Sequence, residues 1–347
     1  MNHKTGLLLV NLGTPRSPKP RDVYRYLIEF LTDERVMDMP WLKRQLLVRG
    51  LIVPMRYRQS AHAYQQIWTD QGSPLMVFGK QVKEKLQQIL GGKFCVELAM
   101  RYQEPSIQKG LDSLMAAEID HLVVLPLFPH YASATTGSVH QKVQELLSRY
   151  RVIPKVTLID HYATHPKLIS AFCEVAKPYH PEKYDHILFS FHGLPERHLR
   201  DADTSGQCLV KSDCCQSLCR RNRNCYSAQC HATARAIVKG LDLPAGYSHT
   251  ICFQSRLGKD PWIQPYTSAS IAELAKQGKK RILVFCPAFV CDCLETIYEI
   301  GVEYAEEFKH AGGERLDLVP GLNAHPSWIE ALRALVYDNC NNLPENI

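Results

Sequence analysis

The chain has 347 residues, of which 45% are hydrophobic and 22% charged, and its formal net charge is +6. This length suits two domains of ordinary globular composition, which can bury a core without disulfides. The modest positive charge fits an acidic small molecule or an anionic membrane surface, but it is too weak and too scattered to indicate a nucleic-acid-binding protein.

The first apolar run, Leu7–Val10, is too short for a signal peptide or a membrane span, and no other run reaches the length that a span requires. We therefore expect a cytoplasmic protein, whose thiols stay reduced. Its 13 cysteines are odd in number, and Cys214 and Cys215 are adjacent, which is poor geometry for a mutual disulfide. Both features argue against a disulfide framework.

Short runs rich in Val, Ile and Leu alternate with longer segments of helical period. The predicted strands are Leu7–Asn11, Phe94–Met100, Leu122–Leu127, Val156–Asp160, Ile187–Phe191, Ile251–Gln254, Ile282–Phe285 and Leu316–Val319. The predicted helices include Arg21–Leu31, Phe78–Leu90, Ser138–Tyr150, Thr233–Lys239, Ser268–Gln277 and Leu294–Phe308. This alternation predicts an α/β fold with parallel sheets flanked by helices, in which ligands bind beyond the carboxyl ends of the strands.

The two halves of the chain carry similar strand ends. "VNLGTP" resembles "SFHGLP", and "VVLPLFPHY" resembles "VFCPAFVCD". The repeat predicts two similar domains that face each other across a cleft, although chance similarity among α/β proteins is a competing interpretation. We expect an N-terminal domain at 1–160, a C-terminal domain at 161–322, and a last helix within 323–347 that packs back on the N-terminal domain.

The segment 39–57, "MPWLKRQLLVRGLIVPMRY", interleaves large apolar residues with Lys43, Arg44, Arg49 and Arg56. One interpretation is a surface that touches lipid, with its apolar side down and its cations at the headgroups. The other is a core helix with a solvated basic edge, and the residues alone favour that second interpretation.

Polar residues that could carry chemistry follow several strands. His192 comes directly after an apolar strand and could exchange a proton near neutral pH, although a structural histidine is an equally good reading. Arg101 and Tyr102 follow a strand of the first half, and arginine is a natural bidentate partner for a substrate carboxylate.

A second candidate is a series of carboxylates in "CDCLETIYEIGVEYAEE". Asp292, Glu295, Glu299 and Glu303 are spaced by three, four and four residues, which places them on one helical face. A solvated acidic face is the usual explanation of such a pattern. Because the helix directly follows a strand and a turn, its first carboxylates could instead carry a divalent cation or protons into a cleft.

Six motifs together resemble the ferrochelatase family in order and spacing: "LVNLGTP", "MRYQEPSI", "FPHYASATTGS", "SFHGLPERH", "CFQSRLGKDPWI" and "CPAFVCDCLETIYEI". The resemblance extends from about Leu7 to the region near Leu335. It implies two Rossmann-like domains around a cleft, and an enzyme that inserts ferrous iron into a porphyrin to give haem.

The resemblance also implies site residues. His192, Glu295 and Glu299 correspond to the family's catalytic positions, with His192 and Glu295 meeting the substrate iron. Porphyrin-binding positions fall on Leu12, Tyr64, Ser73, Arg101, Tyr102, Trp262 and Tyr298. Segment 39–57 coincides with the family's apolar lip, which favours its membrane interpretation. One departure is Cys293, which stands where many relatives have a histidine.

The stretch 206–230 holds six cysteines and looks like an insertion beside the active-site lip. Neighbouring thiols in a reduced compartment indicate a metal group, and the pair spacing typical of zinc sites is missing. Some ferrochelatases hold a 2Fe–2S cluster on such an internal group. We expect Cys208, Cys214, Cys215 and Cys225 to be the ligands, with Cys219 and Cys230 in reserve, and Lys211, Arg220, Arg221 and Arg223 to compensate the cluster charge.

These observations together predict a protoporphyrin ferrochelatase with ferrous iron as substrate and a 2Fe–2S cluster. The alternatives are a coproporphyrin ferrochelatase and a non-catalytic haem or iron–sulfur sensor on the same fold. The expected partners are protoporphyrin IX, ferrous iron and the inner-membrane surface, which the protein would touch peripherally from the cytoplasm. No nucleic acid is expected, and a homodimer is one option for the assembly.

Overall fold

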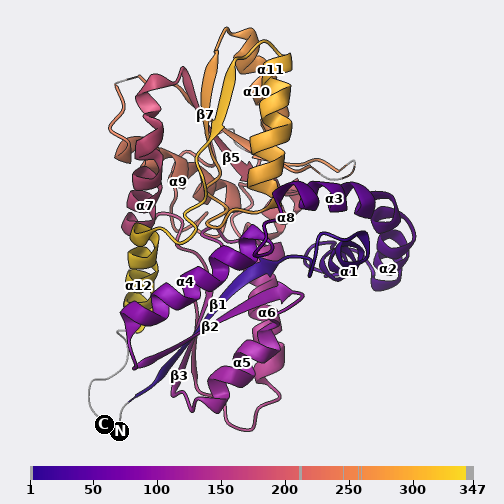
Figure 1. Cartoon of the computed structure of the whole chain (residues 1–347), viewed down its shortest axis with the longest axis vertical. Helices are drawn as coiled ribbons and strands as arrows, with labels where there is room; N and C mark the ends of the chain where they lie inside the picture. Colours follow the sequence, from indigo (N-terminus) through magenta and orange to yellow (C-terminus); the bar gives the residue numbers. More distant parts are fainter. Residues whose placement is uncertain (1–2, 211–212, 245, 257, 259, 341–347) are drawn as a thin grey trace. The chain divides into compact units, whose positions relative to one another are not determined.

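The computed structural model describes residues 3–340, apart from 211–212, 245, 257 and 259 (Figure 1). The chain divides into two compact units. Unit 1 comprises Met1–Phe128, Ser133–Asp160 and Ile329–Ile347, and unit 2 comprises Pro129–Ala132 and His161–Trp328. The C-terminal stretch from Ile329 is thus part of unit 1.

Unit 1 is built on a parallel sheet in the order β2-β1-β3-β4. Its strands are β1 (Thr5–Gly13), β2 (Phe94–Tyr102), β3 (His121–Pro126) and β4 (Lys155–Leu158). One face is covered by α5 (Ile107–Ala116) and α6 (Ser138–Leu147), whose apolar residues pack with Leu8, Val10 and Val124. On the other face α4 (Pro74–Leu90) approaches β2 closely, since Gly79 lies against Leu98.

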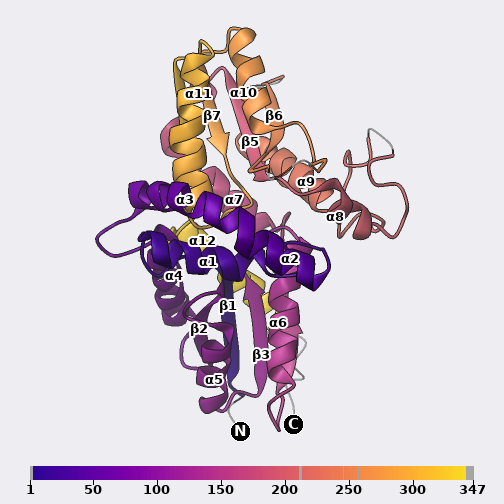
Figure 2. The ribbon, with the colours of Figure 1, turned by 90° about the vertical axis from the view of Figure 1, so that its right-hand side faces the viewer.

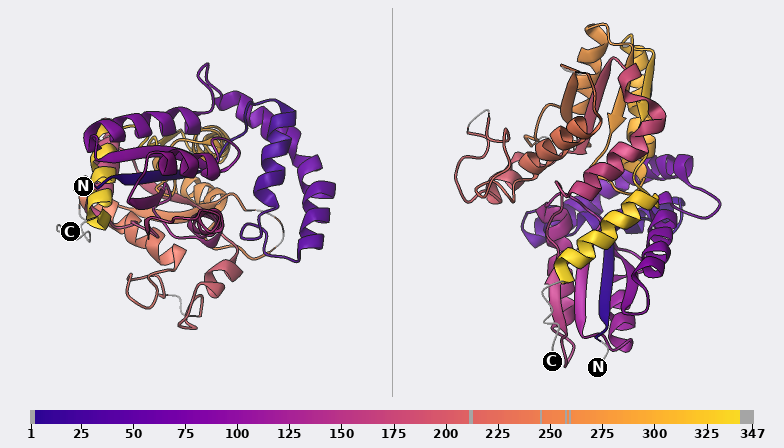
Figure 3. Two further views of the ribbon diagram at one scale, coloured as in Figure 1. Left: turned by 90° about the horizontal axis from the view of Figure 1, so that it is seen from below. Right: turned by 90° about the vertical axis from the view of Figure 1, so that its left-hand side faces the viewer.

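Two further parts complete unit 1. Helix α12 (Pro326–Cys340) places Tyr337 edge-on against Phe94 of β2, and the right-hand view of Figure 3 shows this yellow helix crossing the strands of unit 1 at an angle. A helical arm, residues 20–67, comprises α1 (Pro20–Leu31), α2 (Trp41–Leu47), the π-helical turn η1 (Val48–Ile52) and α3 (Val53–Ile67). The arm has its own small core around Ile28, Leu31, Val48 and Val53. Figures 1 and 2 show it beyond the carboxyl end of this sheet.

Unit 2 repeats the same topology in the order β6-β5-β7-β8. Its strands are β5 (His186–His192), β6 (His249–Gln254), β7 (Arg281–Phe285) and β8 (Arg315–Leu318). Its helices are α7 (Pro166–Ala176), α8 (Glu196–Asp201), α9 (Tyr226–Gly240), α10 (Thr267–Lys276) and α11 (Ala305–His310), with the short turns η3 (Lys177–Tyr179) and η4 (Pro181–Lys183). In Figure 1, α7 and α9 lie on one side of its strands and α10 and α11 on the other.

The predicted α/β class with parallel sheets is confirmed, and each of the eight predicted strands matches an observed strand to within a residue or two. The internal repeat is visible in backbone detail. Gln103 follows β2 with φ 69° and Ser255 follows β6 with φ 66°. The strand N–H groups of Met100 and Phe253 then donate to the carbonyls of Pro105 and Pro265 at 2.7 and 2.9 Å.

One predicted helix differs in kind. Leu294–Phe308 was expected to be an α-helix, but Glu295–Tyr304 forms a π-helix, η5, and only the following α11 is α-helical. A π-helix bonds residue i to i+5, and such stretches often occur at functional sites. Its wider turn keeps residues spaced by four close to one line, so Glu295, Glu299 and Glu303 stay on one face.

Candidate active site

His192 is the last residue of β5, a central strand of the unit 2 sheet. The connection from β5 leads to β6 on one side, and β7 pairs on the other, so His192 stands where the strand order reverses. In open α/β sheets such a switch point is the usual place for a ligand. The sequence placed His192 at a strand end, and the sheet order adds that it is the strand end best suited to a site.

The imidazole of His192 is oriented by its own backbone. Its Nδ1 lies 2.6 Å from the carbonyl oxygen of Gly193, and a carbonyl can only accept. Nδ1 therefore carries the proton in the neutral ring, which leaves the lone pair on Nε2. The rings of Trp262 and Phe289 flank the imidazole, each with its centroid 6.3 Å away. Aromatic rings therefore flank the imidazole, and Nε2 is the ring nitrogen whose lone pair can accept a proton.

The turn after His192 requires glycine. A Cβ on Gly193 would lie 2.8 Å from the carbonyl oxygen of Gln254 and 3.0 Å from the Trp262 ring. The Gly193 N–H donates to that same Gln254 carbonyl at 2.8 Å. The close approach joins the ends of β5 and β6 and fixes the peptide unit between His192 and Gly193.

Glu299, on η5, is held at both carboxylate oxygens. Its Oε2 accepts from Ser255 Oγ at 2.6 Å and from Gln254 Nε2 at 3.2 Å, and its Oε1 accepts from the Tyr304 hydroxyl at 3.2 Å. Burial raises the pKa of Glu299 above its ordinary value, against the hydrogen bond from Ser255 and the charge of a protonated His192, which lower it. A carboxylate with a raised pKa, electrostatically coupled to a histidine, is suited to receiving a proton.

Glu295 begins η5 and is only half-buried. Its carbonyl accepts from Gln254 Nε2 at 2.8 Å, so Gln254 ties the start of η5 to the end of β6. Cys293 is buried, and its thiol lies in hydrogen-bonding contact with the Glu295 carboxylate. Burial, followed by the Glu295 charge, raises the pKa of Cys293 well above its ordinary value, so the group is a neutral thiol.

Asp292 does not belong to the acidic face that its spacing suggested. It is buried before the start of η5, where its Oδ1 accepts from Gly321 N and Thr296 Oγ1, both at 3.0 Å. Its Oδ2 accepts from Asn323 Nδ2 at 2.7 Å. All of these partners are structural, so Asp292 anchors the loop after β8 instead of leading cations or protons inward.

The two remaining unit 2 positions lie on the same elements. Trp262 is buried, pairs through its backbone with Pro195, and packs against Gly193 and His192. Tyr298 is half-buried on η5, between the two glutamates in sequence. The structure therefore brings together His192, Trp262, Glu295, Tyr298 and Glu299 around the ends of β5 and β6 and the start of η5.

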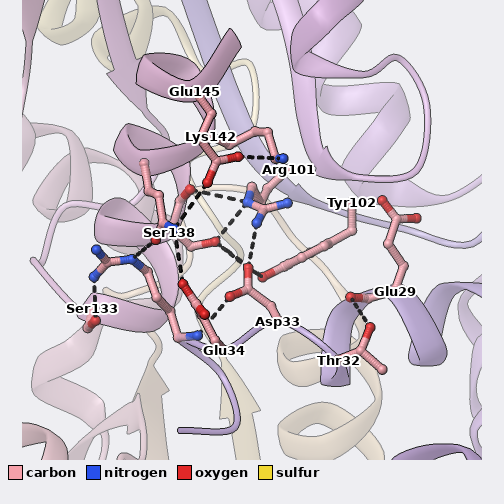
Figure 4. Close-up of polar contacts among 12 residues, drawn as sticks. Glu29, Thr32, Asp33, Glu34, Arg101, Tyr102, Ser133, Ser138, Lys142 and Glu145 are labelled. Carbon is pink, nitrogen blue, oxygen red and sulfur yellow. Dashed lines mark hydrogen bonds and ion pairs between the residues drawn. The ribbon is translucent and has the colours of Figure 1, made fainter. Parts of the chain in front are cut away.

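The unit 1 positions Arg101 and Tyr102 belong to a buried polar network around Asp33 (Figure 4). Asp33 Oδ2 accepts from Arg101 Nη2 at 2.5 Å, from the Tyr102 hydroxyl at 2.8 Å and from Ser138 Oγ at 2.6 Å. Burial acts to raise the pKa of Asp33. Four contacts outweigh it and hold the pKa below the ordinary value: hydrogen bonds from Ser138, the Arg35 N–H and Tyr102, and the charge of Arg101. Arg101 thus already has a carboxylate partner inside the protein.

The other three unit 1 positions are ordered by neighbours in the same unit. Leu12 lies at the end of β1, and its N–H donates to Asn11 Oδ1 at 2.8 Å. Tyr64 is buried on α3, with its ring edge-on to Trp68. Ser73 precedes α4 and is buried, and Thr14 Oγ1 donates to its hydroxyl at 2.8 Å.

Four of the six clustered thiols of unit 2 are gathered together. The Cys214 and Cys215 sulfurs are 3.8 Å apart, and Cys225 is in hydrogen-bonding contact with both Cys215 and Cys208. A hydrogen bond from the Cys215 thiol outweighs burial and lowers the pKa of Cys225 to about 6, while burial and the neighbouring Cys225 charge raise the pKa of Cys208 to about 12.

The reserve cysteines lie elsewhere. Cys219 is exposed, and Cys230 is buried within α9 beside Tyr226. Lys211 falls outside the described residues. Within the part of the chain that the structure describes, no three His, Cys, Asp or Glu side chains converge as they would around a single metal ion.

Several residues of these sites were not predicted from the sequence. Asp33, Gln254, Ser255 and Tyr226 each contact a predicted residue through a hydrogen bond that connects distant parts of the chain. Only Gln254 and Ser255 had a local signal, because Gln254 ends a predicted strand and Ser255 directly follows it. The residues next to Asp33 and Tyr226 in the sequence do not indicate that these two side chains contact Arg101 and His192.

Comparison with known proteins places these features in a family. A profile described as ferrochelatase matches residues 4–340. Ferrochelatases from Legionella pneumophila (strain Lens) and Pseudomonas fluorescens (strain Pf0-1) are 44% and 45% identical to the chain over 333 and 332 residues. These matches cover 96% and 95% of this chain, and 98% and 96% of the relatives.

Solved structures agree on the fold. SirB from Bacillus subtilis, solved with Fe3+, aligns with a TM-score of 0.54 over 97% of this chain and 96% of its own. A sirohydrochlorin chelatase SirB from Bacillus subtilis subspecies spizizenii, in complex with cobalt, aligns with a TM-score of 0.53. At 14% and 12% identity these likenesses support two chelatase-type α/β domains.

Proposed function

The chain belongs to the ferrochelatase family and is a lyase that inserts ferrous iron into a porphyrin to make haem, and we propose that its porphyrin is protoporphyrin IX. The observation that carries the choice of porphyrin is the apolar surface of the helical arm. Trp41, Leu42, Leu46 and Met55 are each more than 60% exposed there. Such a surface suits a substrate less polar than coproporphyrin, which carries additional carboxylates.

We assign the base to His192. Metallation requires that two N–H protons leave the porphyrin as iron enters, so a proton acceptor must face the ring. With Nδ1 engaged by the Gly193 carbonyl, Nε2 is the nitrogen free to accept. The nearby Glu299 would stabilise the protonated imidazole and pass its proton on toward Glu303, whose own pKa is raised by burial and by Glu299.

Glu295 is proposed to meet the substrate iron together with His192. The charges of Glu295 and of His192 both act on Glu299, and Glu295 is half-exposed. Such a carboxylate and an imidazole offer oxygen and nitrogen ligands, which ferrous iron accepts without the tight hold of a thiolate site. Weak ligation is what transfer requires, since the ion must be stripped of water and then released to the porphyrin. We further propose that Leu12, Tyr64, Ser73, Arg101, Tyr102, Trp262 and Tyr298 contact the porphyrin.

The experiment compares kcat/KM for protoporphyrin IX and coproporphyrin III under anaerobic conditions, with ferrous iron, for wild type and His192→Ala. We expect protoporphyrin to be preferred, and H192A to lose metallation while it still quenches porphyrin fluorescence on binding. A preference for coproporphyrin would overturn the substrate, and wild-type turnover by H192A would overturn the base. Phe289→Leu is the matched control, because it alters a flanking ring but no proton acceptor.

We also propose that Cys208, Cys214, Cys215 and Cys225 hold a 2Fe–2S cluster. Their sulfurs contact one another in pairs, and a 2Fe–2S cluster takes its four thiolates as two per iron. The Cys225 thiolate would also receive backbone N–H groups of Ser227 and Ala228 at the start of α9. When bound, the cluster would supply a cross-link and a one-electron redox group, and no step of iron insertion requires it.

Iron and acid-labile sulfide in oxygen-free protein test the cluster. We expect equal iron and sulfide in wild type, loss of both in Cys225→Ser, and retention in Cys219→Ser, the matched control with an exposed thiol. Zinc without sulfide would exclude the cluster and leave the chelatase assignment intact.

The arm supports a third proposal, peripheral contact with the inner membrane from the cytoplasm. Its exposed apolar residues are interleaved with the exposed cations Lys43, Arg49 and Arg56. Arg44 is not one of these cations, because it is buried and its Nη1 donates to Met39 O at 2.9 Å. No helix among the described residues is long and apolar enough to cross a membrane.

A homodimer stays a prediction, which sedimentation analysis would test.

A further inference from the structure

The thiol-bearing segment of unit 2 is attached at both ends to the end of β5. On its N-terminal side, the chain leaves His192, forms α8, and reaches Asp203, whose Oδ2 accepts from the Cys208 N–H at 2.8 Å. On its C-terminal side, α9 begins at Tyr226, whose hydroxyl donates to the carbonyl oxygen of His192 at 2.9 Å. The gathered thiols therefore lie on a loop of 34 positions that starts and finishes at His192.

Tyr226 is itself held rigidly. Its side chain is buried, and its ring meets the imidazole of His130 edge-on at a centroid distance of 6.0 Å. His130 is in turn fixed by Thr233 of α9, whose Oγ1 is 2.8 Å from its Nε2. The Tyr226 hydroxyl also contacts the Cys230 thiol. An alternative place for this hydroxyl would require α9 to move.

The peptide unit that Tyr226 contacts is the one that aims His192. The carbonyl of His192 accepts from Tyr226, and the N–H of the same peptide unit, from Gly193, donates to Gln254 O. The next carbonyl, of Gly193, accepts from the imidazole Nδ1. Tyr226 and Gln254 thus hold opposite sides of one peptide plane, and that plane sets the direction of the catalytic ring.

Cys225 immediately precedes Tyr226 and is the N-cap residue of α9. Whatever joins Cys225 to Cys208, Cys214 and Cys215 therefore fixes the first turn of α9, one residue from the hydroxyl that reaches His192. A group that closes a loop removes much of its conformational freedom. Without such a group, the segment is ordered by hydrogen bonds, among them those that Asn222 Nδ2 donates to the carbonyls of Cys214 and Ser217 at 3.1 and 2.8 Å.

We propose that Tyr226 is a positioning residue for His192, and that the metal group on the four thiols controls, through Tyr226, how firmly His192 is held. The proposal rests on the four-thiolate group proposed above. It makes the cysteine-rich segment a regulator of iron insertion, because loss of the group would loosen His192 without removing any residue that touches substrate.

The first test compares wild type, Tyr226→Phe and Tyr247→Phe as anaerobic full-length proteins. Tyr247 is the matched control, since its hydroxyl also donates to backbone carbonyls of unit 2, those of Pro181 and Tyr184. Amide hydrogen exchange is measured for the peptide 187–199, together with kcat and KM. In Y226F we expect exchange to rise and kcat to fall by about 3- to 10-fold, the factor for one lost hydrogen bond, with KM unchanged. Wild-type exchange and kcat in Y226F would overturn the positioning role.

The second test adds Cys208→Ser and the double variant C208S/Y226F. If the thiol group acts through Tyr226, C208S raises exchange in 187–199 as Y226F does, and the double variant adds little to either change. Equal effects that simply add would overturn the coupling. Wild-type protein that carries no metal would overturn both the coupling and the cluster, while the Y226F comparison would still decide the role of the hydroxyl.

Discussion

Ser255 Oγ donates a 2.6 Å hydrogen bond to Glu299 Oε2, and it does so from a left-handed backbone conformation with φ 66°. This conformation costs a non-glycine residue about 1 kcal/mol, and such residues concentrate at functional sites. The hydrogen bond opposes the rise in the pKa of Glu299 that burial causes. Ser255 therefore favours the deprotonated form of the partly buried Glu299 carboxylate.

We predict that Ser255→Ala raises the pKa of Glu299 further, because the charged carboxylate loses a hydrogen bond that lowers this pKa. Because the role proposed for Glu299 requires the deprotonated carboxylate, the acidic limb of the kcat profile should shift to higher pH as well. Kinetics between pH 5 and pH 9 would measure the shift.

Ser255→Gly is the matched control for backbone strain. Glycine also lacks the hydroxyl but accepts a positive φ. S255G should therefore show the same pH shift as S255A, and its free energy of unfolding should be about 1 kcal/mol larger than that of S255A. A shift in S255A that S255G does not share would mean that strain, and not the hydroxyl, acts on Glu299.

The ion pair between Arg101 and Asp33 predicts a stability effect. Arg101→Gln would leave a buried carboxylate without its cation, which costs about 3–5 kcal/mol, and the double variant D33N/R101Q should recover much of that loss. Urea unfolding would measure both. Lys109→Gln breaks an exposed pair with Glu104 and should cost less than about 1 kcal/mol.

The same variant tests the proposed substrate role of Arg101. If its main partner is Asp33, R101Q should change KM for the porphyrin less than about twofold once the protein is folded, well below the loss expected for a desolvated charge pair. A large rise in KM with little change in stability would show instead that Arg101 binds a substrate carboxylate.

The strands could be predicted because a strand buried on both faces must be almost wholly apolar, which makes runs such as Leu122–Leu127 conspicuous. His192 could be located because it ends such a run. The π-helical form of Glu295–Tyr304 could not be predicted, since its pattern of apolar residues also fits an α-helix. The carboxylate spacing was right for the glutamates and misleading for Asp292, because its partners Gly321 and Asn323 lie about 30 residues away.

The supporting residues were beyond the sequence for a different reason. Asp33 reaches Arg101 across 68 positions, and Ser255 reaches Glu299 across 44. Short polar side chains such as these also favour turns, which is the ordinary explanation for both. Only the folded sheets bring Asp33 and Ser255 to their partners. The pattern of residues within one short stretch of sequence therefore does not indicate either pair.

His130 predicts how stability depends on pH. It is fully buried, and burial lowers its pKa to about 3. In the unfolded chain a histidine titrates near 6.5, so between these values the unfolded state binds one more proton. The free energy of unfolding should therefore fall as the pH drops below about 6.5, by up to about 1.4 kcal/mol per pH unit from this residue.

His130→Gln should remove that contribution, so that the unfolding free energy of the variant declines less steeply between pH 6.5 and pH 4.5. Urea titrations at several pH values would measure the slope. His310→Gln, at an exposed position of α11, is the control and should leave the slope unchanged. An unaltered slope in H130Q would mean that other groups dominate the acid sensitivity.

The arm predicts a membrane partition that surface mutations can remove. Trp41 and Leu46 are 66% and 67% exposed, so Trp41→Ser with Leu46→Ser should leave stability unchanged. Burying one large apolar side chain contributes about 1.5–3 kcal/mol, so the double variant should bind anionic vesicles at least about tenfold more weakly.

Val152→Ser with Ile153→Ser is the matched control, because these residues are 81% and 50% exposed on a loop outside the arm. Vesicle co-sedimentation at low and high salt separates the apolar contribution to binding from the electrostatic one. Added salt should weaken only the electrostatic contribution, which comes from Lys43, Arg49 and Arg56. An equal loss in the two double variants would show that exposed apolar area anywhere on the protein causes the binding, and that the arm is not the docking surface.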